Sequence, residues 1–263
     1  LLLSGLLSYS WGDVRYFPVM LAVILVNFFA GLAIERFDSR PAARRAIVLL
    51  ALVFSIGWLA FFKYTDFFLS NLNGLFGLSV PYLGLTLPLG ISFYTFQIMT
   101  YTVDVYARKV PAEHSLIDFG TFVVLFPQLI AGPIVKYSDI SQELKSRRVT
   151  LAGIQEGIAL FILGLGSKVL LANNVGALWS QVDALGFGNV STALAWLALL
   201  GYGLQIYFDF SGYSLMAIGM GKALGFTFPK NFDYPYISRS ITEFWRRWHM
   251  TLGGWFREYV YIP

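Results

Sequence analysis

The stretch of sequence best suited to chemistry is residues 241–252, Ile-Thr-Glu-Phe-Trp-Arg-Arg-Trp-His-Met-Thr-Leu. It places His249, one of two histidines in the chain, beside paired tryptophans and paired arginines. Read as one helix that continues to residue 259, the segment carries an apolar stripe at three- and four-residue spacing, formed by Ile241, Phe244, Trp245, Trp248, Leu252, Trp255, Phe256 and Tyr259. His249 would border this stripe. A poorly solvated imidazole beside basic residues could transfer a proton to a substrate held at a membrane boundary.

The same segment has a second interpretation, as an anchor helix that lies in the membrane interface. Tryptophan, tyrosine and arginine gather at bilayer interfaces because amphipathic rings and long cationic side chains suit that zone. Periodicity by itself favours the anchor helix over a catalytic histidine.

A second candidate lies at residues 205–214, Gln-Ile-Tyr-Phe-Asp-Phe-Ser-Gly-Tyr-Ser, where Asp209 and Tyr213 stand among aromatic residues. Ionisable groups inside apolar segments are costly and usually face a protein interior or a cavity. The window could be a buried polar network that holds helices together. It could equally be a cavity wall that orients a hydroxyl substrate or the histidine. Gln128 is a lone amide in another apolar run, which interhelical hydrogen bonding explains.

The elements that must position these residues are membrane helices. The chain has 263 residues, of which 57% are hydrophobic and 13% charged, against about 25% charged in a soluble domain. Lipid requires internally satisfied backbones, so long apolar runs predict an all-α integral membrane protein. The absence of cysteine excludes disulfides, thiolate metal sites and cysteine nucleophiles. The net charge of +4 comes from basic residues clustered in loops, which indicates membrane topology and not nucleic-acid binding.

Hydropathy predicts one multi-span domain over residues 1–263, incomplete at both ends. The predicted spans are close to the roughly 20 residues that cross about 30 Å of hydrocarbon. The spans are residues 16–34, 46–62, 87–106, 151–171 and 192–207, after the tail of an earlier span at residues 1–9. Four arginines place the loop 35–45 in the cytoplasm, whereas residues 65–85, without Lys or Arg, and the loop 173–189 lie outside.

Residues 119–135 form an apolar run of a different kind. Pro127, Gly132 and Pro133 interrupt it, and basic residues flank it on both sides. A hydrophobic segment with both ends on one side of the membrane and helix breakers inside it predicts a re-entrant segment. A simple proline-kinked span remains the alternative. Broken backbone at membrane depth must be buried in protein or line a wet cavity.

Five stretches of sequence together resemble the membrane-bound O-acyltransferase (MBOAT) family, and within it the bacterial alginate O-acetylation branch. They are residues 87–97 (Leu-Pro-Leu-Gly-Ile-Ser-Phe-Tyr-Thr-Phe-Gln), 126–134 (Phe-Pro-Gln-Leu-Ile-Ala-Gly-Pro-Ile), 207–214 (Tyr-Phe-Asp-Phe-Ser-Gly-Tyr-Ser), 244–252 (Phe-Trp-Arg-Arg-Trp-His-Met-Thr-Leu) and 255–263 (Trp-Phe-Arg-Glu-Tyr-Val-Tyr-Ile-Pro). One such motif would be weak, but all five in this order are specific. The resemblance covers almost the whole chain.

The resemblance implies a helical bundle around a buried tunnel and acyl transfer to a hydroxyl group. It implies that His249 is one of two signature histidines, and that the second, in a Trp-His-Gly context after residue 263, is the base. The chain would then be the N-terminal part of the protein, truncated before its C-terminal helices and inactive alone. We therefore expect His249 to be catalytic. We expect substrate contacts from Gln128, Asp209, Tyr213, Trp245, Arg246, Arg247 and Trp248, and neither a metal nor a bound cofactor.

The resemblance also implies the substrates and the place of the reaction. The donor would be acetyl-CoA or a similar thioester from the cytoplasmic side, whose phosphates Arg246 and Arg247 could attract. His249 would orient or polarise the thioester carbonyl, or shuttle a proton. The acetyl group would pass to a periplasmic polysaccharide-acetylation protein. The expected location is the bacterial cytoplasmic (inner) membrane, with membrane lipid as the surroundings.

Three alternatives stay open at this point. D-alanyl transfer toward teichoic acid would use a similar motif around His249. A secondary transporter or a subunit of a polysaccharide export complex would also have broken helices and intramembrane polar groups, although the chain shows none of the internal repeats usual in transporters. The third alternative is a structural scaffold in a synthase complex.

Overall fold

The computed structural model describes residues 1–129 and 132–262, and the side chain of Asp13 lies outside the description. Within these ranges every regular element is helical, as the sequence predicts. The chain divides into two compact units: Leu1–Ile130 with Lys136–Lys145, and Ala131–Val135 with Ser146–Pro263. Four helices are long and apolar enough to cross a membrane, namely Val14–Arg36, Pro41–Phe76, Leu151–Leu185 and Thr192–Ala223.

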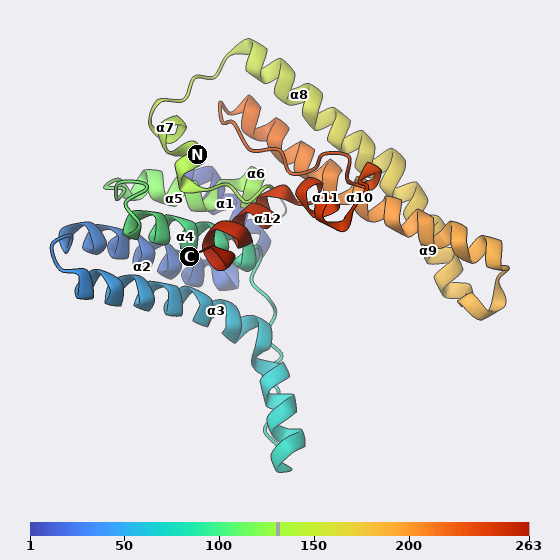
Figure 1. The fold of residues 1–263 in the computed structure, drawn as a ribbon, viewed down its shortest axis with the longest axis horizontal. Helices are drawn as coiled ribbons and strands as arrows, with labels where there is room; N and C mark the ends of the chain where they lie inside the picture. Colours follow the sequence, from blue (N-terminus) through green and yellow to red (C-terminus); the bar gives the residue numbers. More distant parts are fainter. Residues whose placement is uncertain (130–131, 263) are drawn as a thin grey trace. The chain divides into compact units, whose positions relative to one another are not determined.

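The first unit contains the elements from α1 to α7 (Figure 1). They are α1 (Leu2–Asp13), the short 3₁₀ turn η1 (Val14–Tyr16), α2 (Phe17–Arg36), α3 (Pro41–Phe76), α4 (Ile91–Tyr106), α5 (Leu116–Val124), α6 (Phe126–Leu129) and α7 (Tyr137–Ser146). A polar cluster joins the three longest helices, because the Asn27 side chain on α2 donates to Ser55 Oγ on α3 at 3.0 Å and accepts from Thr102 Oγ1 on α4 at 3.0 Å. All three side chains are buried, so the cluster satisfies its own polar groups inside the bundle.

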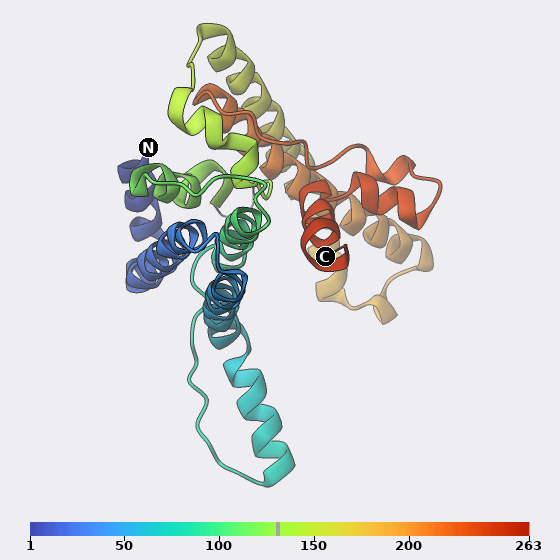
Figure 2. The same ribbon diagram turned by 60° about the vertical axis from the view of Figure 1, so that its left-hand side comes forward.

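Helix α3 is longer than the sequence predicts. The predicted span 46–62 extends to Phe76, so residues 65–76 are helical and not loop. Gly77, in the left-handed conformation with φ of 64°, ends the helix. The Asp66 carboxylate then accepts the backbone N–H groups of Leu83 at 2.8 Å and Gly84 at 3.0 Å. These bonds hold the returning chain alongside α3, as Figure 2 shows in cyan.

Helix α4 corresponds to the predicted span 87–106 but begins only at Ile91, after Gly90 with φ of 68°. Its 16 residues are fewer than the ~20 that cross a bilayer. Buried side chains lie all around it, including Tyr94, Gln97, Tyr101 and Asp104, so α4 is an internal helix of the first unit.

The run 119–135 is broken, as its prolines and glycine predict. Helix α5 ends at Val124, Leu125 is extended with ψ of 100°, and α6 is a single turn. Pro127 has no N–H to continue the ladder from α5, so the helix restarts here instead of passing through. Residues 130 and 131 lie outside the described part. Beyond them, Gly132 is a bend and the chain runs without regular structure to Lys136.

The second unit begins with α8 (Leu151–Gly166), which continues through a π-helical stretch η2 (Ser167–Ala172) into α9 (Asn173–Leu185). The other elements are η3 (Phe187–Asn189), α10 (Thr192–Ala223), η4 (Pro235–Ile237), α11 (Ile241–Arg247), α12 (Met250–Phe256) and a last π-helical stretch η5 (Arg257–Tyr261). The outer loop predicted at residues 173–189 is therefore wrong for most of its length. No proline interrupts the sequence between residues 166 and 185, so α9 extends the preceding helix.

Helices α8 and α10 lie side by side in both views (Figures 1 and 2). Glycines make this possible: a Cβ on Gly157 would lie 2.5 Å from the Gly219 oxygen, and one on Gly164 would lie 2.5 Å from the Gly212 oxygen. Such close backbone contact is the usual way in which membrane helices pack.

The predicted span 192–207 also extends further, to Ala223, so Asp209 and Tyr213 lie within α10 and not after it. Within α10, the carboxylate of Asp209 forms an ion pair with Lys168 of η2. Lys222 and Glu156 form a second pair between α10 and α8 at 2.8 Å.

Candidate active site

The segment around His249 is not the continuous helix that its periodicity predicts. Helix α11 ends at Arg247, Trp248 is extended with φ of −102° and ψ of 128°, and His249 is left-handed with φ of 43° and ψ of 53°. This conformation costs a residue with a Cβ roughly 1–2 kcal/mol. Helix α12 then begins at Met250. The predicted single apolar stripe is therefore divided between two helices, and Ile241 is 75% exposed whereas Trp255 is 4% exposed.

Backbone hydrogen bonds from residues 231–233 stabilise this interruption between α11 and α12. The backbone N–H of Asp233 donates to the Arg247 carbonyl at 2.9 Å, and the backbone N–H of Met250 donates to the Asn231 carbonyl at 2.9 Å. The two hydrogen bonds lie on either side of residues 248 and 249. Backbone strain of this kind persists only where the surroundings determine it, and it concentrates at functional sites.

The side chain of Asn231, 1% exposed, is the centre of the hydrogen bonds at the break. Its Oδ1 atom accepts from the backbone N–H of Thr251 at 3.2 Å, from Thr251 Oγ1 at 2.9 Å, and faces His249 Nδ1 at 3.1 Å. A backbone N–H can only donate, so the atom that faces it must be the amide oxygen. The same oxygen faces Nδ1, which must therefore carry the ring hydrogen.

This hydrogen-bond pattern assigns the tautomer of His249. With the hydrogen on Nδ1, neutral imidazole has a lone pair on Nε2, which is then a proton acceptor. Burial lowers the pKa of His249 to about 4, so the ring is neutral near pH 7. The arrangement is that of a half-buried, oriented base whose Nε2 atom is unprotonated.

Thr251 extends the hydrogen bonds to the broken segment. Its hydroxyl accepts the backbone N–H of Ile134 at 3.0 Å while it donates to Asn231 Oδ1. Ile134 belongs to the same unit as His249. A chain of hydrogen bonds therefore leads from the Gly-Pro-Ile stretch at residues 132–134 through Thr251 and Asn231 to the imidazole.

Aromatic rings enclose His249 and its neighbour Trp248. Phe210 of α10 and His249 are in edge-to-face contact, with 4.8 Å between their ring centroids. Phe232 stacks on the His249 ring with 6.5 Å between centroids. Trp248 packs in the aromatic cluster formed by Tyr207, Phe210, Phe232, Tyr236 and Phe244. The cluster removes water from the imidazole, which is the physical cause of its lowered pKa.

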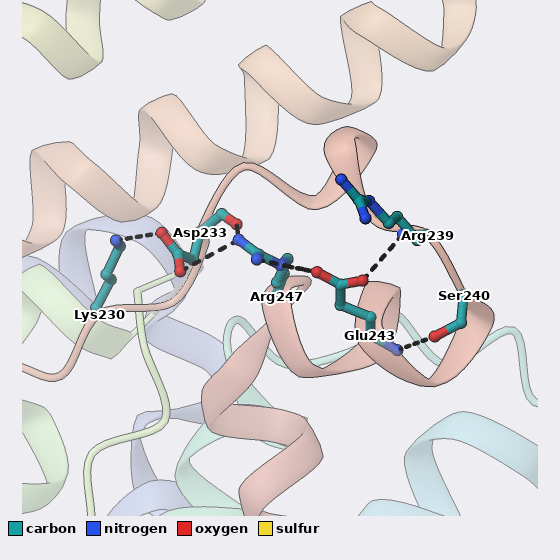
Figure 3. Close-up of polar contacts among 6 residues, drawn as sticks. All are labelled: Lys230, Asp233, Arg239, Ser240, Glu243 and Arg247. Atoms are coloured by element: carbon teal, nitrogen blue, oxygen red, sulfur yellow. Dashed lines mark hydrogen bonds and ion pairs between the residues drawn. The ribbon is translucent and has the colours of Figure 1, made fainter.

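A row of charged residues fixes α11 beside this cluster (Figure 3). Lys230 pairs with Asp233 at 2.6 Å, and Arg247 bridges the Asp233 carboxylate at 3.6 Å and Glu243 at 3.0 Å. Glu243 also accepts the backbone N–H of Arg239 at 2.9 Å, and this bond, followed by Arg247, keeps the pKa of Glu243 below its usual value. At the start of the helix, Ser240 caps the N–H of Glu243.

The other predicted site residues fall into different surroundings. Arg247 is half-buried and engaged in the row of charges, whereas Arg246 is exposed and forms no ion pair within the described residues. Trp245 is 60% exposed, and Trp248 belongs to the aromatic cluster. Substrate contacts by these residues stay predictions.

Three further predicted residues have other surroundings. Asp209 pairs with Lys168, and Tyr213 is half-buried one turn further along α10. Gln128 lies in the first unit, fully buried, and its amide donates to the Phe122 carbonyl at 2.9 Å. Substrate contacts by these three residues also stay predictions.

Sequence reasoning missed Asn231 and Thr251. Asn231 lies 18 residues before His249 and Thr251 lies two residues after it, but neither belongs to a recognisable local pattern. The one available signal was a polar residue at the start of the aromatic stretch 231–236, Asn-Phe-Asp-Tyr-Pro-Tyr.

Residues 104–263, which include His249, Asn231 and the aromatic cluster, match the model of MBOAT, the membrane-bound O-acyltransferase family. The chain belongs to the membrane-bound O-acyltransferase family. The resemblance found in the sequence motifs is thereby confirmed, and so is the all-α membrane fold that it implied.

Relatives of this MBOAT chain carry names from polysaccharide modification. It is 42% identical to "Probable alginate O-acetylase AlgI" of Pseudomonas aeruginosa, over all of this chain and 51% of that protein. It is 36% identical to the "Peptidoglycan O-acetyltransferase" of Helicobacter pylori, over all of this chain and 55% of that protein. The "Teichoic acid D-alanyltransferase" of Streptococcus thermophilus is 32% identical over 66% of this chain and 43% of that protein. The chain thus spans about half the length of the relatives that it matches throughout.

Proposed function

We propose that this MBOAT chain is part of an O-acyltransferase that moves an acetyl group from a cytoplasmic thioester toward a polysaccharide such as alginate. The observation that carries the proposal is the oriented, neutral imidazole of His249, with Nδ1 bound to Asn231 and Nε2 unprotonated. A base of this kind is what acyl transfer to a hydroxyl requires, because the hydroxyl must lose its proton as it attacks. The location that fits is the bacterial inner membrane, where such a thioester is at hand.

The tautomer favours one role for His249. Polarising a thioester carbonyl needs a donor, and a neutral imidazole with its hydrogen on Nδ1 offers none at Nε2. Shuttling a proton needs an acceptor, which Nε2 provides. In the proposed step the acceptor oxygen forms a bond to the carbonyl carbon and the C–S bond breaks. The hydroxyl proton goes to the enzyme base and then to the leaving thiolate.

Arg246 is the better candidate for holding the donor. A thioester such as acetyl-CoA carries phosphates, which guanidinium groups bind well. Arg247 already has two carboxylate partners, whereas Arg246 has none within the described residues. We therefore assign the phosphate contact to Arg246, and the support of α11 to Arg247.

The names of the relatives support the proposed acceptor. Two relatives that match the whole chain are named for O-acetyl transfer, to alginate in one case and to peptidoglycan in the other. We propose a periplasmic polysaccharide-acetylation protein as the partner that receives the acetyl group. D-alanyl transfer toward teichoic acid is the second candidate, and its relative matches only 66% of the chain. Membership of the acyltransferase family argues against the transporter and scaffold readings.

The test uses cells that carry the full-length gene. His249→Ala should abolish acetyl esters on the secreted polysaccharide at an unchanged level of membrane protein. His114→Ala is the matched control, because His114 is the other histidine of the chain, is exposed, and pairs with Glu35 at 2.8 Å. Wild-type acetylation in the His249→Ala strain would refute the proposal. D-alanine esters that depend on His249, without acetyl esters, would move the assignment to the second candidate.

A further inference from the structure

The hydrogen bonds of Asn231 point to a function for this residue in the reaction. We propose that Asn231 is the positioning residue that fixes the tautomer and the orientation of His249, so that Nε2 is the nitrogen that exchanges protons with the substrate. This inference rests on the proposed function, since it specifies how His249 acts within it. Nothing in the sequence motifs assigned Asn231 to the site.

The geometry supports this function in two ways. The amide oxygen of Asn231 is held by two donors of Thr251, the backbone N–H and the hydroxyl, so its direction is set independently of the histidine. The asparagine side chain is also 1% exposed, so water does not compete for its oxygen. An acceptor with a fixed direction and no water can hold Nδ1–H in one orientation, as partners of histidine do in metal and catalytic sites.

Asn231 has a structural function as well, from which the proposal must be separated. Its carbonyl and its side chain accept the N–H groups of Met250 and Thr251, the first two residues of α12. They replace the N-cap that the left-handed His249 does not supply. Simple removal of the side chain would therefore disturb the helix start and the histidine together.

A carboxylate separates the two functions. Asn231→Asp keeps an oxygen for Thr251 and for Nδ1, and aspartate is as good a capping residue as asparagine. It adds a negative charge about 3 Å from the ring, which favours the protonated imidazole and raises the pKa of His249 by about one to three units. A purely structural Asn231 would leave the pH dependence of the reaction unchanged.

Among the described residues of the second unit, no charged side chain is in contact with the ring to obscure this effect. The described neighbours that pack directly on the imidazole are the aromatic residues Phe210 and Phe232 and the amide of Asn231. The charged residues on the surrounding elements are already paired with one another: Asp209 with Lys168, Glu156 with Lys222, Lys230 with Asp233, and Arg247 with Asp233 and Glu243. Arg239, Arg246, Arg257 and Glu258 are exposed on their elements.

The experiment measures acetyl transfer by the full-length protein in native membranes as a function of pH. Asn231→Asp should move the acidic limb of the pH–activity profile one to three pH units above that of wild type. Asn231→Leu, of similar size but without an acceptor, should lower kcat at least about tenfold with little change in KM for the thioester. Asn189→Asp is the control, because it makes the same chemical change on an exposed residue of the same unit.

A wild-type pH profile in Asn231→Asp would overturn the proposal, as would wild-type kcat in Asn231→Leu. If Asn231→Leu fails to fold, the aspartate variant still decides. A second readout does not depend on activity: ¹⁵N NMR of histidine-labelled protein, with the His249 signals assigned by their loss in His249→Gln. In wild type the ring hydrogen of neutral His249 should be on Nδ1. In Asn231→Asp the form with hydrogens on both ring nitrogens should persist to a higher pH than in wild type. If wild type transfers no acetyl group but NMR shows this pattern, the proposed function fails while the Asn231–His249 contact stands.

Discussion

The contact between α8 and α10 gives a prediction whose size follows from the structure. Substituting alanine for Gly157 places a Cβ 2.5 Å from the Gly219 oxygen and 2.7 Å from the Ala223 nitrogen. Both atoms belong to backbone, so no side chain can turn away. Ordinary contact begins at 3.4 Å, so the helices must separate by about 0.9 Å, the difference 3.4 − 2.5. Overpacking of this kind costs about 1–3 kcal/mol.

The gain in helix propensity on replacing glycine by alanine, roughly 1 kcal/mol, offsets part of that cost. Gly157→Ala should therefore lower the stability of the protein by about 0–2 kcal/mol. Gly166→Ala is the matched control on the same helix, because its Cβ would meet nothing within 4 Å. It should be neutral or stabilising by up to about 1 kcal/mol.

The assay is the midpoint of thermal unfolding of the full-length protein in detergent, measured for both variants at one heating rate. A difference of 1 kcal/mol corresponds to about 2–4 °C in a protein of this size class. We expect Gly157→Ala to unfold below Gly166→Ala by several degrees, and to lose acetyl transfer because α10 carries Phe210, which packs on His249. Equal midpoints for the two variants would refute the close packing of α8 and α10.

Three other predictions concern the site itself. Arg246→Gln should raise KM for the thioester several-fold and leave the midpoint of thermal unfolding unchanged. Arg247→Gln should instead lower that midpoint, because Glu243 and Asp233 lose their partner. The reverse pattern in kinetics and melting curves of the two variants would contradict these assignments. Phe210→Leu should raise the pKa of His249 toward its ordinary value by admitting water, so activity should fall more at pH 5.5 than at pH 8; an unaltered pH–rate profile would count against aromatic shielding. Because burial lowers the pKa of His249 to about 4, the unfolded chain binds the proton of this histidine more tightly than the folded protein does. The contribution of His249 to the free energy of unfolding should therefore decline as the pH falls from about 6.5 toward 4. His249→Gln should remove that part of the pH dependence of unfolding.

The class of the protein could be predicted from the sequence, and residues 244–252 could be singled out as a candidate site, because both depend on local composition. Long apolar runs with few charges require membrane helices, and the pairing of histidine with tryptophan and arginine marks residues 244–252 in any fold. The break in residues 119–135 was also predictable, because Pro127 interrupts the helical hydrogen bonds of the segment in which it lies.

The errors have a common physical cause in contacts between distant residues. Periodicity reports only apolar spacing, and nothing at Trp248 or His249 is a helix breaker, so the continuous helix 241–259 was a natural prediction. The break is held instead by Asn231, from an earlier segment. Similarly, Asp209 looked like the end of a span because its partner, Lys168, lies on another helix. Local patterns do not contain such pairings.

The central claim is that His249 is a neutral, oriented base in acetyl transfer. The most direct measurement is transfer of radiolabelled acetyl groups from acetyl-CoA to polysaccharide by the purified full-length protein with its partner in vesicles, with wild type compared with His249→Gln. Glutamine retains a donor for Asn231 Oδ1 but has no nitrogen that can take up a proton. We expect loss of labelled ester in His249→Gln at unchanged folding and thioester binding. Labelled ester formed at the wild-type rate would contradict it.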